Sequence, residues 1–496
     1  MDSIKTISLI VLHILCCFGS TSQSYGQNSL KRFTLHEVID LAKERSPKVL
    51  EAKASFLTSY LAHRTFIVSN LPQISLSPLS YSYNHSLIPS YAKDSFLVAN
   101  VINNSVGLNI SQNIPYMGGQ LNVSSNLMSA KDLNGLAPNY STNLYSIQYS
   151  QPLTLFNNYK WERKTELLRM EQAKRIYVQA IEDISSQAVD MFFELASAQI
   201  NYEVTKLNYS NADTLYKLSK GRYQIGKIVE SDLLQMQLGY LQSGIALTMA
   251  KLALETQESN LSTFLALPPD EKFELIIPTE HPYFSIEFNK AIQLVKENNP
   301  DMLTVNMKLI EAKKNVKQIF WDNWLNSANL TASYGLSSQG SVLNKLTNNP
   351  SVASGFSVGI TIPILGYGIR KGKYRLARLN QLIATEQADQ QLNSMKKNIL
   401  NVVTQFEQQN DLLRIAALSD TIAQKRYFIS KQRFMMGKID VLDLNKATTD
   451  KDNSRNQYIS ALHNYWRIYY QLRQLTLYDF IAEKPIRVDF EELLKN

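Results

Sequence analysis

The sequence has almost no cysteine, and the little it has lies near the N-terminus. Cys16 and Cys17 are its two cysteines among 496 residues. Both fall at the end of an apolar run, residues 7–18, which is followed by a small-x-small site at 24–26. This pattern is typical of a secretory signal peptide, so we expect residues 1–26 to be removed. A leucine precedes Cys16, which disfavours a lipoprotein. The mature chain would then contain no disulfide, cysteine nucleophile or cysteine–zinc site.

Long hydrophobic runs are missing from the rest of the chain. No uninterrupted apolar stretch after the signal approaches the roughly 18 residues of a membrane-spanning helix. The formal net charge is +8, but the lysines and arginines are interspersed with acidic residues along helical stretches. Such mixing is typical of a solvated helix surface rather than of a nucleic-acid groove, so we expect no nucleic-acid partner.

Charge is scarce in two segments. Residues 73–151 contain four charged residues, which are Lys93, Asp94, Lys131 and Asp132, and residues 326–364 contain only Lys345. Apolar residues alternate with small polar ones in both segments, as at 106–110 and 356–362. Period-two alternation predicts strands. A soluble β-sandwich is one interpretation. The charge-free strands favour the other, a membrane β-barrel with an apolar outer face and a polar inner face.

A second feature is an internal duplication. Residues 219–232 read SKGRYQIGKIVESD, and residues 430–443 read SKQRFMMGKIDVLD. The matched pairs, all 211 residues apart, are Arg222/Arg433, Tyr223/Phe434, Gly226/Gly437, Lys227/Lys438 and Asp232/Asp443. Glycine followed by lysine between long periodic stretches predicts a helix end, a turn and a new helix.

The duplication divides the mature chain into two repeats. We predict a first structural repeat at 27–283, with its β segment at about 73–152, and a second at 284–475, with its β segment at about 326–364. Residues 476–496 form a tail that packs on the helical rod. The earlier part of the repeats matches 253 residues apart, so the first β segment holds a 42-residue insertion near 103–129. Four strands are therefore expected in the first segment and two in the second.

The helical stretches have definite expected lengths. One helix should run from about residue 157 to 224 and another from 229 to 265. In the second, Leu234, Leu238, Leu241 and Ile245 step by four, three and four residues, as in a coiled-coil seam. A third pattern, Thr34 followed by Glu37, is a capping box, and Pro47 and Pro300 mark matching joints.

Aromatic residues gather where helices and strands are expected to meet. They are Trp161, Trp321, Trp324, Tyr367 and Tyr374, with basic residues beside them. This combination suits a membrane interface. The alternative is that these are ordinary core aromatics.

We find no motif for catalysis or for a cofactor. Gly221 to Lys227 resembles a phosphate-binding loop, but Ile228 stands where serine or threonine would be needed, and the second copy has Gln432 in place of Gly221. The histidines have no metal-ligand spacing. We therefore expect neither an enzyme nor a bound cofactor or metal.

With these features in place, the mature chain resembles the TolC family of outer-membrane efflux proteins. The resemblance implies an α+β membrane protein, in which a duplicated helix–strand–helix repeat forms a long antiparallel coiled-coil helical barrel continued by a transmembrane β-barrel. It implies a homotrimer that acts as a passive exit duct in the outer membrane, with its helices in the periplasm. One chain supplies too few strands for a closed barrel, which also favours assembly.

The resemblance also implies partners and sites. A periplasmic adaptor and an inner-membrane pump for efflux or type I secretion would dock at the hairpin tips, at Arg222, Gly226, Lys227, Arg433, Gly437 and Lys438. Asp232, Asp443 and Lys446 would lie at the periplasmic entrance. Phe434, Ile439 and Lys446 depart from the family pattern of locking residues, so we hypothesise that Asp443 and Lys446 form charged rings or pair across subunits. An intrachain surface pair is the alternative. A periplasmic coiled-coil scaffold without a pore is the alternative function.

Overall fold

The computed structural model describes residues 31–90, 95–133, 138–153, 156–268, 273–278, 282–324, 327–361, 365 and 367–495. The expected signal peptide lies outside these residues. The chain forms two compact units. The smaller unit comprises the residues up to Arg45, Ala188–His281 and Ile439–Asp443, and the larger unit comprises Ser46–Gln187, Pro282–Lys438 and Leu444–Asn496. Each unit takes segments from both predicted repeats, so the repeat boundaries remain a prediction.

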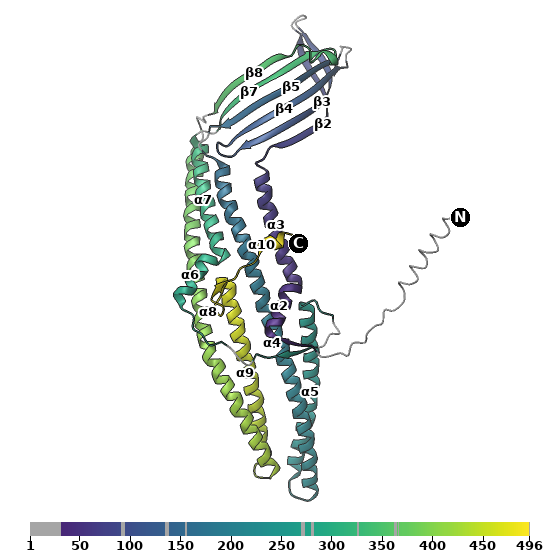
Figure 1. Ribbon diagram of the computed structural model, residues 1–496, viewed down its shortest axis with the longest axis vertical. Coiled ribbons are helices and arrows are strands. Elements are labelled where there is room, and N and C mark those ends of the chain that lie inside the picture. Colours follow the sequence, from purple (N-terminus) through teal and green to yellow (C-terminus); the bar gives the residue numbers. More distant parts are fainter. Residues whose placement is uncertain are drawn as a thin grey trace, which may run out of the picture. The chain divides into compact units, whose positions relative to one another are not determined.

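The larger unit contains one antiparallel sheet of six strands (Figure 1). The strands are β2 (Gln73–Ser90), β3 (Ser95–Ile114), β4 (Gly119–Asp132), β5 (Asn139–Pro152), β7 (Ser327–Gly340) and β8 (Ser351–Thr361). They neighbour one another in that order. Four strands come from the first low-charge segment and two from the second, which confirms the predicted strand count. Among the described strands, β2 and β8 are the two edges.

Long helices lead into and out of this sheet. Helix α3 (Pro47–Val68) precedes β2, and α7 (Pro300–Trp324) precedes β7. The helices that follow the two strand groups are α4 (Asn158–Gln224) and α8 (Ile369–Met435), and each has 67 residues. The equal length of these two helices is what the internal duplication predicts.

The joints predicted at Pro47 and Pro300 are confirmed. Helix α2 (Leu35–Arg45) ends two residues before α3 begins, and α6 (Phe288–Asn298) ends two residues before α7. Proline at the first position of α3 and α7 loses nothing, because the first N–H groups of a helix have no partner within it. The Asn299 side chain donates to the Leu475 carbonyl at 3.1 Å and so fixes the second joint to α9 (Val441–Thr476).

The core of the larger unit is aromatic where α8 and α9 pack together. Phe406 lies 5.4 Å from Tyr465 and 5.0 Å from Phe284, measured between ring centroids. Tyr465 and Tyr469 are fully buried, and burial raises the pKa of both phenols well above the ordinary value. The Tyr465 hydroxyl donates to the carbonyl of Pro282, which satisfies its one polar atom inside the core.

A buried ion pair joins α9 to α4 in the same unit. Arg473 Nε donates to Glu182 Oε2 at 2.7 Å, and Arg473 Nη1 donates to Asp479 Oδ2 at 2.6 Å. Glu182 is 1% exposed. Burial alone would lower the pKa of Arg473, but the hydrogen bond and charge of Glu182 raise it overall. The guanidinium therefore stays charged and holds two carboxylates.

The C-terminal tail packs on α3 and α4. It contains the short strands β9 (Tyr478–Asp479) and β10 (Lys484–Pro485) and the helix α10 (Phe490–Lys495). Phe490 lies 5.1 Å from Phe56 of α3 and 6.1 Å from Tyr177 of α4, between ring centroids.

The smaller unit is built on α4, α5 (Glu230–Phe264) and a two-stranded parallel sheet, β1 (Lys31–Thr34) with β6 (Phe273–Ile276). Gln199 of α4 fixes β6 in both directions: its amide donates to the Phe273 carbonyl at 2.8 Å and accepts from the Leu275 N–H at 3.1 Å. The capping box is confirmed, because Glu37 Oε2 accepts from the Thr34 N–H at 2.7 Å.

The predicted seam of α5 does not face α4. Tyr240 of α5 stacks on Tyr209 and Tyr216 of α4, with centroids 5.2 and 5.9 Å apart. The residues at heptad spacing, Leu234, Leu238, Leu241 and Ile245, are instead 55–58% exposed. Heptad spacing indicates an apolar stripe but not its partner, and in this chain the stripe is left open.

Candidate functional site

The turn between α4 and α5 is a glycine-terminated helix end. Gly226 has φ +69°, a conformation that costs glycine little. Its N–H donates to the Tyr223 carbonyl, and the Lys227 N–H donates to the Arg222 carbonyl, both at 2.9 Å. This pair of bonds is the Schellman motif, which satisfies carbonyls that the end of a helix leaves open.

The turn between α8 and α9 repeats this geometry. Gly437 has φ +70°, and its N–H donates to the Phe434 carbonyl at 2.9 Å. The Lys438 N–H donates to the Arg433 carbonyl at 2.9 Å. The sequence prediction of two matching helix ends is confirmed down to the individual hydrogen bonds. Side chains of Lys227, Arg433 and Lys438 are exposed, and Arg222 is half-buried.

Sequence reasoning missed a residue of the second turn. Asp440 precedes α9, and its Oδ1 accepts from the Asp443 N–H at 2.8 Å, which makes it the helix cap. The signal was available, since Asp440 is followed three residues later by another acidic residue. The matching position before α5 is Val229, which makes no side-chain cap. The two turns therefore share a helix end but differ at the helix start.

The expected entrance residues are placed as follows. Asp232 and Asp443 lie in the first turns of α5 and α9, where the helix dipole favours a carboxylate. Asp232 is half-buried and Asp443 is exposed. Phe434, which departs from the family pattern, is buried at 4% exposure.

Lys446 is part of an intrachain charge cluster. Its Nζ lies 3.2 Å from Asp450 Oδ1, and Arg426 Nη1 of α8 lies 2.5 Å from Asp450 Oδ2. The hydrogen bond from Lys446 lowers the pKa of Asp450, and Arg426 lowers it further. The alternative of an intrachain pair thus applies to Lys446, but its partner is Asp450, one turn along α9, rather than Asp443.

A second ionic link joins the same two helices. Arg455 of α9 donates to Asp420 Oδ2 of α8 at 2.9 Å, and the Asp420 side chain is 7% exposed. Gln424 donates to both oxygens of Asp420 at 3.0 Å. Hairpin α8–α9 is therefore tied by charged side chains at two levels, Asp420 and Asp450.

The junction aromatics lie at the ends of helices next to the sheet. Trp161 is in the first turn of α4, and Lys164 Nζ and Lys317 Nζ lie 5.4 and 5.5 Å from its ring centroid. The other members are distributed around α7 and α8. Trp321 packs against Phe320, and the ring centroid of Tyr374 lies 6.1 Å from that of Phe320. Trp324 ends α7, and its side chain is outside the described part. Tyr367 is 90% exposed. Their place at a membrane interface stays a prediction.

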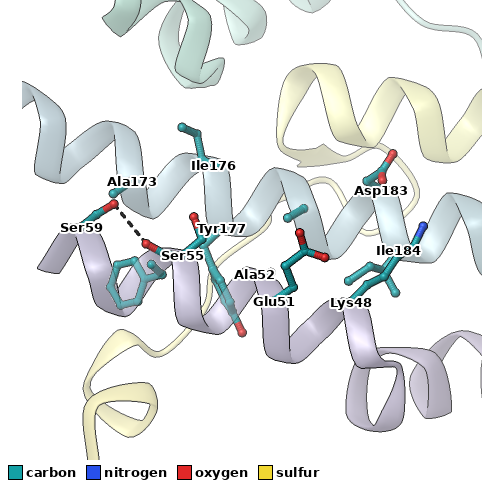
Figure 2. A pocket seen from close by; sticks show the side chains of 12 residues that line it. Lys48, Glu51, Ala52, Ser55, Ser59, Ala173, Ile176, Tyr177, Asp183 and Ile184 are labelled. Carbon is teal, nitrogen blue, oxygen red and sulfur yellow. Dashed lines mark hydrogen bonds between the residues drawn. The ribbon is translucent and has the colours of Figure 1, made fainter. Parts of the chain in front are cut away.

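A groove of about 390 Å³ lies between α3 and α4 (Figure 2). Lys48 and Asp183 are at one end and Ser59 and Ala173 at the other. Two of its charged groups bond to the same glutamine: Lys48 donates to Gln187, and Asp183 accepts from Gln187 at 2.6 Å. This arrangement is that of packed helices.

No three histidine, cysteine or acidic side chains among the described residues come together as a metal site. None of the described helices combines the length and hydropathy needed to cross a membrane.

The expectation of uncharged strands is wrong for β4, which ends with Lys131 and Asp132. A sheet of alternating strands with few charges, joined to duplicated pairs of long helices, defines an outer-membrane channel class. The family model described as "Outer membrane efflux protein" matches residues 38–267 and 291–476. The chain belongs to this family, whose members are channels rather than enzymes. It is an outer-membrane transport protein with its helical part in the periplasm.

Solved structures share the fold. The CmeC outer membrane channel of Campylobacter jejuni has 17% identity and a TM-score of 0.64, over 93% of this chain and 88% of that one. The outer membrane protein VceC of Vibrio cholerae has 15% identity and a TM-score of 0.63, over 91% and 97%. The open-state MtrE channel of Neisseria gonorrhoeae has 16% identity and a TM-score of 0.53, over 89% and 88%. No curated sequence matched.

Proposed function

We propose that this channel is a passive trimeric exit duct of a tripartite efflux or type I secretion system. The observation that carries the proposal is the open sheet. Its strands alternate between apolar and small polar residues, and β2 and β8 each have a neighbour on one side only among the described strands. Open strand edges cannot face lipid, so the sheet needs further copies to close it into a barrel.

The exposed apolar stripe on α5 supports assembly as well. Leu234, Leu238, Leu241 and Ile245 form an unburied seam in the single chain. A neighbouring helix in a trimer would bury it and gain about 25 cal/mol for each Å² of apolar surface removed from water. A scaffold protein without a pore would explain the helices but not the two-faced strands.

The hairpin turns are the proposed docking points for the adaptor, and through it for the pump. Both turns present exposed basic side chains on a rigid Schellman helix end. The cluster of Arg426, Lys446 and Asp450 joins α8, before the second turn, to α9, after it. We therefore propose that this hairpin moves as one body when the entrance opens.

Planar-bilayer recording tests the duct. The mature protein is purified from membranes, its trimer is confirmed by chemical crosslinking, and its conductance is recorded. We expect long-lived openings of small conductance, since a resting duct is nearly closed at its entrance. A folded trimer that inserts into lipid without any conductance would contradict the proposal.

A further inference from the structure

The predicted insertion near 103–129 falls within the strand pair β3–β4, here called the inserted hairpin. It lies within the sheet rather than beside it: β3 is bonded to β2 and β4, and β4 is bonded to β3 and β5. We propose that the inserted hairpin forms part of the pore wall, so that three copies close a barrel of eighteen strands by joining β8 of one copy to β2 of the next. This inference rests on the proposed trimeric duct and concerns how wide it is.

One apolar row crosses five of the six strands and ends before β8, where Tyr334 pairs with Ser354. Residues paired in register across five successive strands are Ile74, Ile110, Val123, Ile147 and Tyr334. The adjacent row, which points to the opposite face, is Gln73, Ser111, Asn122, Gln148, Ser333 and Gly355. A hairpin folded out of the wall would have no reason to match both rows.

The inserted hairpin shows the same two faces over residues 105–111 of β3 and 121–124 of β4, whereas Asn104 and Lys131, nearer its other end, lie on the apolar face. In β3, Val106 and Leu108 fall on the apolar face, and Gly107 and Asn109 fall on the polar face. The polar face of the paired β4 carries Asn122, Ser124 and Asn126. This alternation, with lipid on one side and water on the other, is what a membrane barrel wall requires.

The turn of the inserted hairpin, residues 115–118, is hydrogen-bonded to residues at the end of β5 and just before α4. The Asn157 side chain, just before α4, donates to the carbonyls of Pro115 and Tyr116 at 2.8 and 3.1 Å. Gln151 at the end of β5 donates to the Met117 carbonyl at 2.8 Å. The turn therefore shares its level with the start of α4 and does not project away from the sheet.

The strand directions allow closure. Every neighbouring pair in the sheet is antiparallel, and the strand number is even. The edges β2 and β8 therefore run in opposite directions, and β8 of one copy meets β2 of the next as another antiparallel pair. Adding one hairpin preserves this rule, whereas one added strand would break it.

The stagger of the sheet is that of a barrel. The row that starts at Gln73, the first residue of β2, reaches Gly355, six residues before the end of β8 at Thr361. That is about one residue per strand, which for a rise of about 3.3 Å and a spacing of about 4.8 Å gives a tilt of about 35°. Tilts of this size are typical of closed barrels.

The consequence is a wider exit. With this tilt, eighteen strands give a barrel about 34 Å across between strand axes, against about 22 Å for twelve. Barrels of 16–18 strands leave an aqueous channel. The polar face of the inserted hairpin would line that channel with serine and asparagine side chains, suited to hydrated cargo of large cross-section.

The cysteine-free mature chain allows a direct test. Single cysteines at Leu108 and Asn109 are exposed to a charged, water-soluble thiol reagent in the trimer reconstituted in lipid vesicles. We expect Asn109→Cys to react at least tenfold faster than Leu108→Cys. The control pair is Ser357→Cys and Val358→Cys in β8, a strand outside the insertion. The same trimer, imaged in lipid nanodiscs by electron cryomicroscopy, should show eighteen strands.

The possible outcomes distinguish the place of the inserted hairpin in the wall from the existence of the barrel. Alternating reactivity in β8 but not in β3, or a barrel of twelve strands, would overturn the wall assignment and leave the duct intact. Loss of alternation in both pairs would overturn the barrel itself. A variant that lacks residues 95–138 joins β2 to the antiparallel β5, and we expect it to form a twelve-stranded trimer.

Discussion

At the scale of single residues, Arg473 is the cation that pairs with the buried carboxylate of Glu182. Glu182 is 1% exposed and takes both of its hydrogen bonds in this network from Arg473, at 2.7 and 3.1 Å. Arg473→Ala leaves that carboxylate buried without its cation. We expect a loss of about 3–5 kcal/mol in unfolding free energy, measured by thermal or denaturant unfolding of the purified protein.

The matched control replaces both partners with apolar residues. Glu182→Leu with Arg473→Met should recover most of the loss, because an apolar pair of similar volume needs no desolvated charge. An equal loss in the single and double variants would show that Arg473 acts through Asp479 rather than through Glu182.

The Asp450 cluster predicts a dependence on pH. The hydrogen bond from Lys446 and the contact with Arg426 lower the pKa of Asp450 below the ordinary value of about 3.9. A lowered pKa means that the stabilisation is complete above the ordinary carboxylate pKa and is lost as the pH falls through the lower folded value. Asp450→Asn should therefore melt below the wild type at pH 7, and the gap should shrink as the pH falls below the ordinary carboxylate pKa and through the lower folded value.

Thermal unfolding followed by circular dichroism over this pH range provides the measurement. Asp411→Asn serves as a control, because its pair with Arg414 joins neighbours on one helix and does not connect α8 to α9. A gap for Asp450→Asn that persists unchanged at low pH would refute the ionic role of the cluster.

Long-range pairs of this kind are where sequence reasoning stopped. Glu182 and Arg473 are 291 residues apart, and no local pattern connects them. Lys446 has acidic neighbours at both i−3 and i+4, and either spacing places charges together on a helix. The structure selects Asp450 because Arg426 of α8 approaches the same carboxylate.

At the scale of elements, a side chain added at the glycine of either helical-hairpin turn should lower the stability of that turn. Gly226→Ala and Gly437→Ala should each destabilise their turn by about 1–2 kcal/mol, because φ is +69° and +70°. An added Cβ meets no atom within 4 Å at either position, so the cost is conformational rather than steric. Hydrogen exchange at Lys227 and Lys438, whose N–H groups close the motifs, measures it.

Glycines in the helices supply the controls. Gly239 of α5 and Gly372 of α8 likewise leave open space for a Cβ, but their φ lies outside the positive range. Alanine there should stabilise its helix by about 0.5–1 kcal/mol. If alanine changed stability equally at the turn glycines and at the helix glycines, the positive φ would not be the cause of the destabilisation.

Helix α9 has a side-chain cap at its start and α5 has none, so removing the first cap should lower stability and adding one to α5 should raise it. Asp440→Ala removes the cap of α9 and should cost about 1 kcal/mol. Val229→Asp places a carboxylate at the matching position before α5 and should gain a similar amount. Amide exchange in the first turns of α5 and α9 reports both, and a neutral Asp440→Ala would show that the cap contributes nothing.

Elements were predictable where the sequence repeats itself. The turns followed from paired residues such as Gly226 and Gly437, and the strand count followed from the two different offsets. The partner of the α5 stripe could not be predicted, since heptad spacing is the same whether an apolar face meets its own hairpin or another copy. Tyr240, outside that stripe, makes the intrachain contact with α4 instead.

At the scale of the whole molecule, the proposal requires that both hairpin turns reach the adaptor. Lys227 and Lys438 are exposed and occupy equivalent positions after matching glycines, so a docking partner meets a lysine at the same place on either hairpin. The two turns share their backbone geometry, whereas only the second has a side-chain cap, from Asp440. A partner that recognises basic Schellman turns should therefore contact both.

Site-specific crosslinking in cells tests this requirement. If residues 1–26 are removed as predicted, Lys227→Cys and Lys438→Cys each give a chain with a single thiol. A thiol-reactive photocrosslinker attached to either should capture the adaptor. Lys397→Cys, an exposed position in α8 far along the helix from the turn, is the control and should capture none. Capture from only one turn would mean that the difference at the helix start, Asp440 against Val229, decides docking. Capture from neither turn, in cells where the channel still exports its cargo, would contradict docking at the tips.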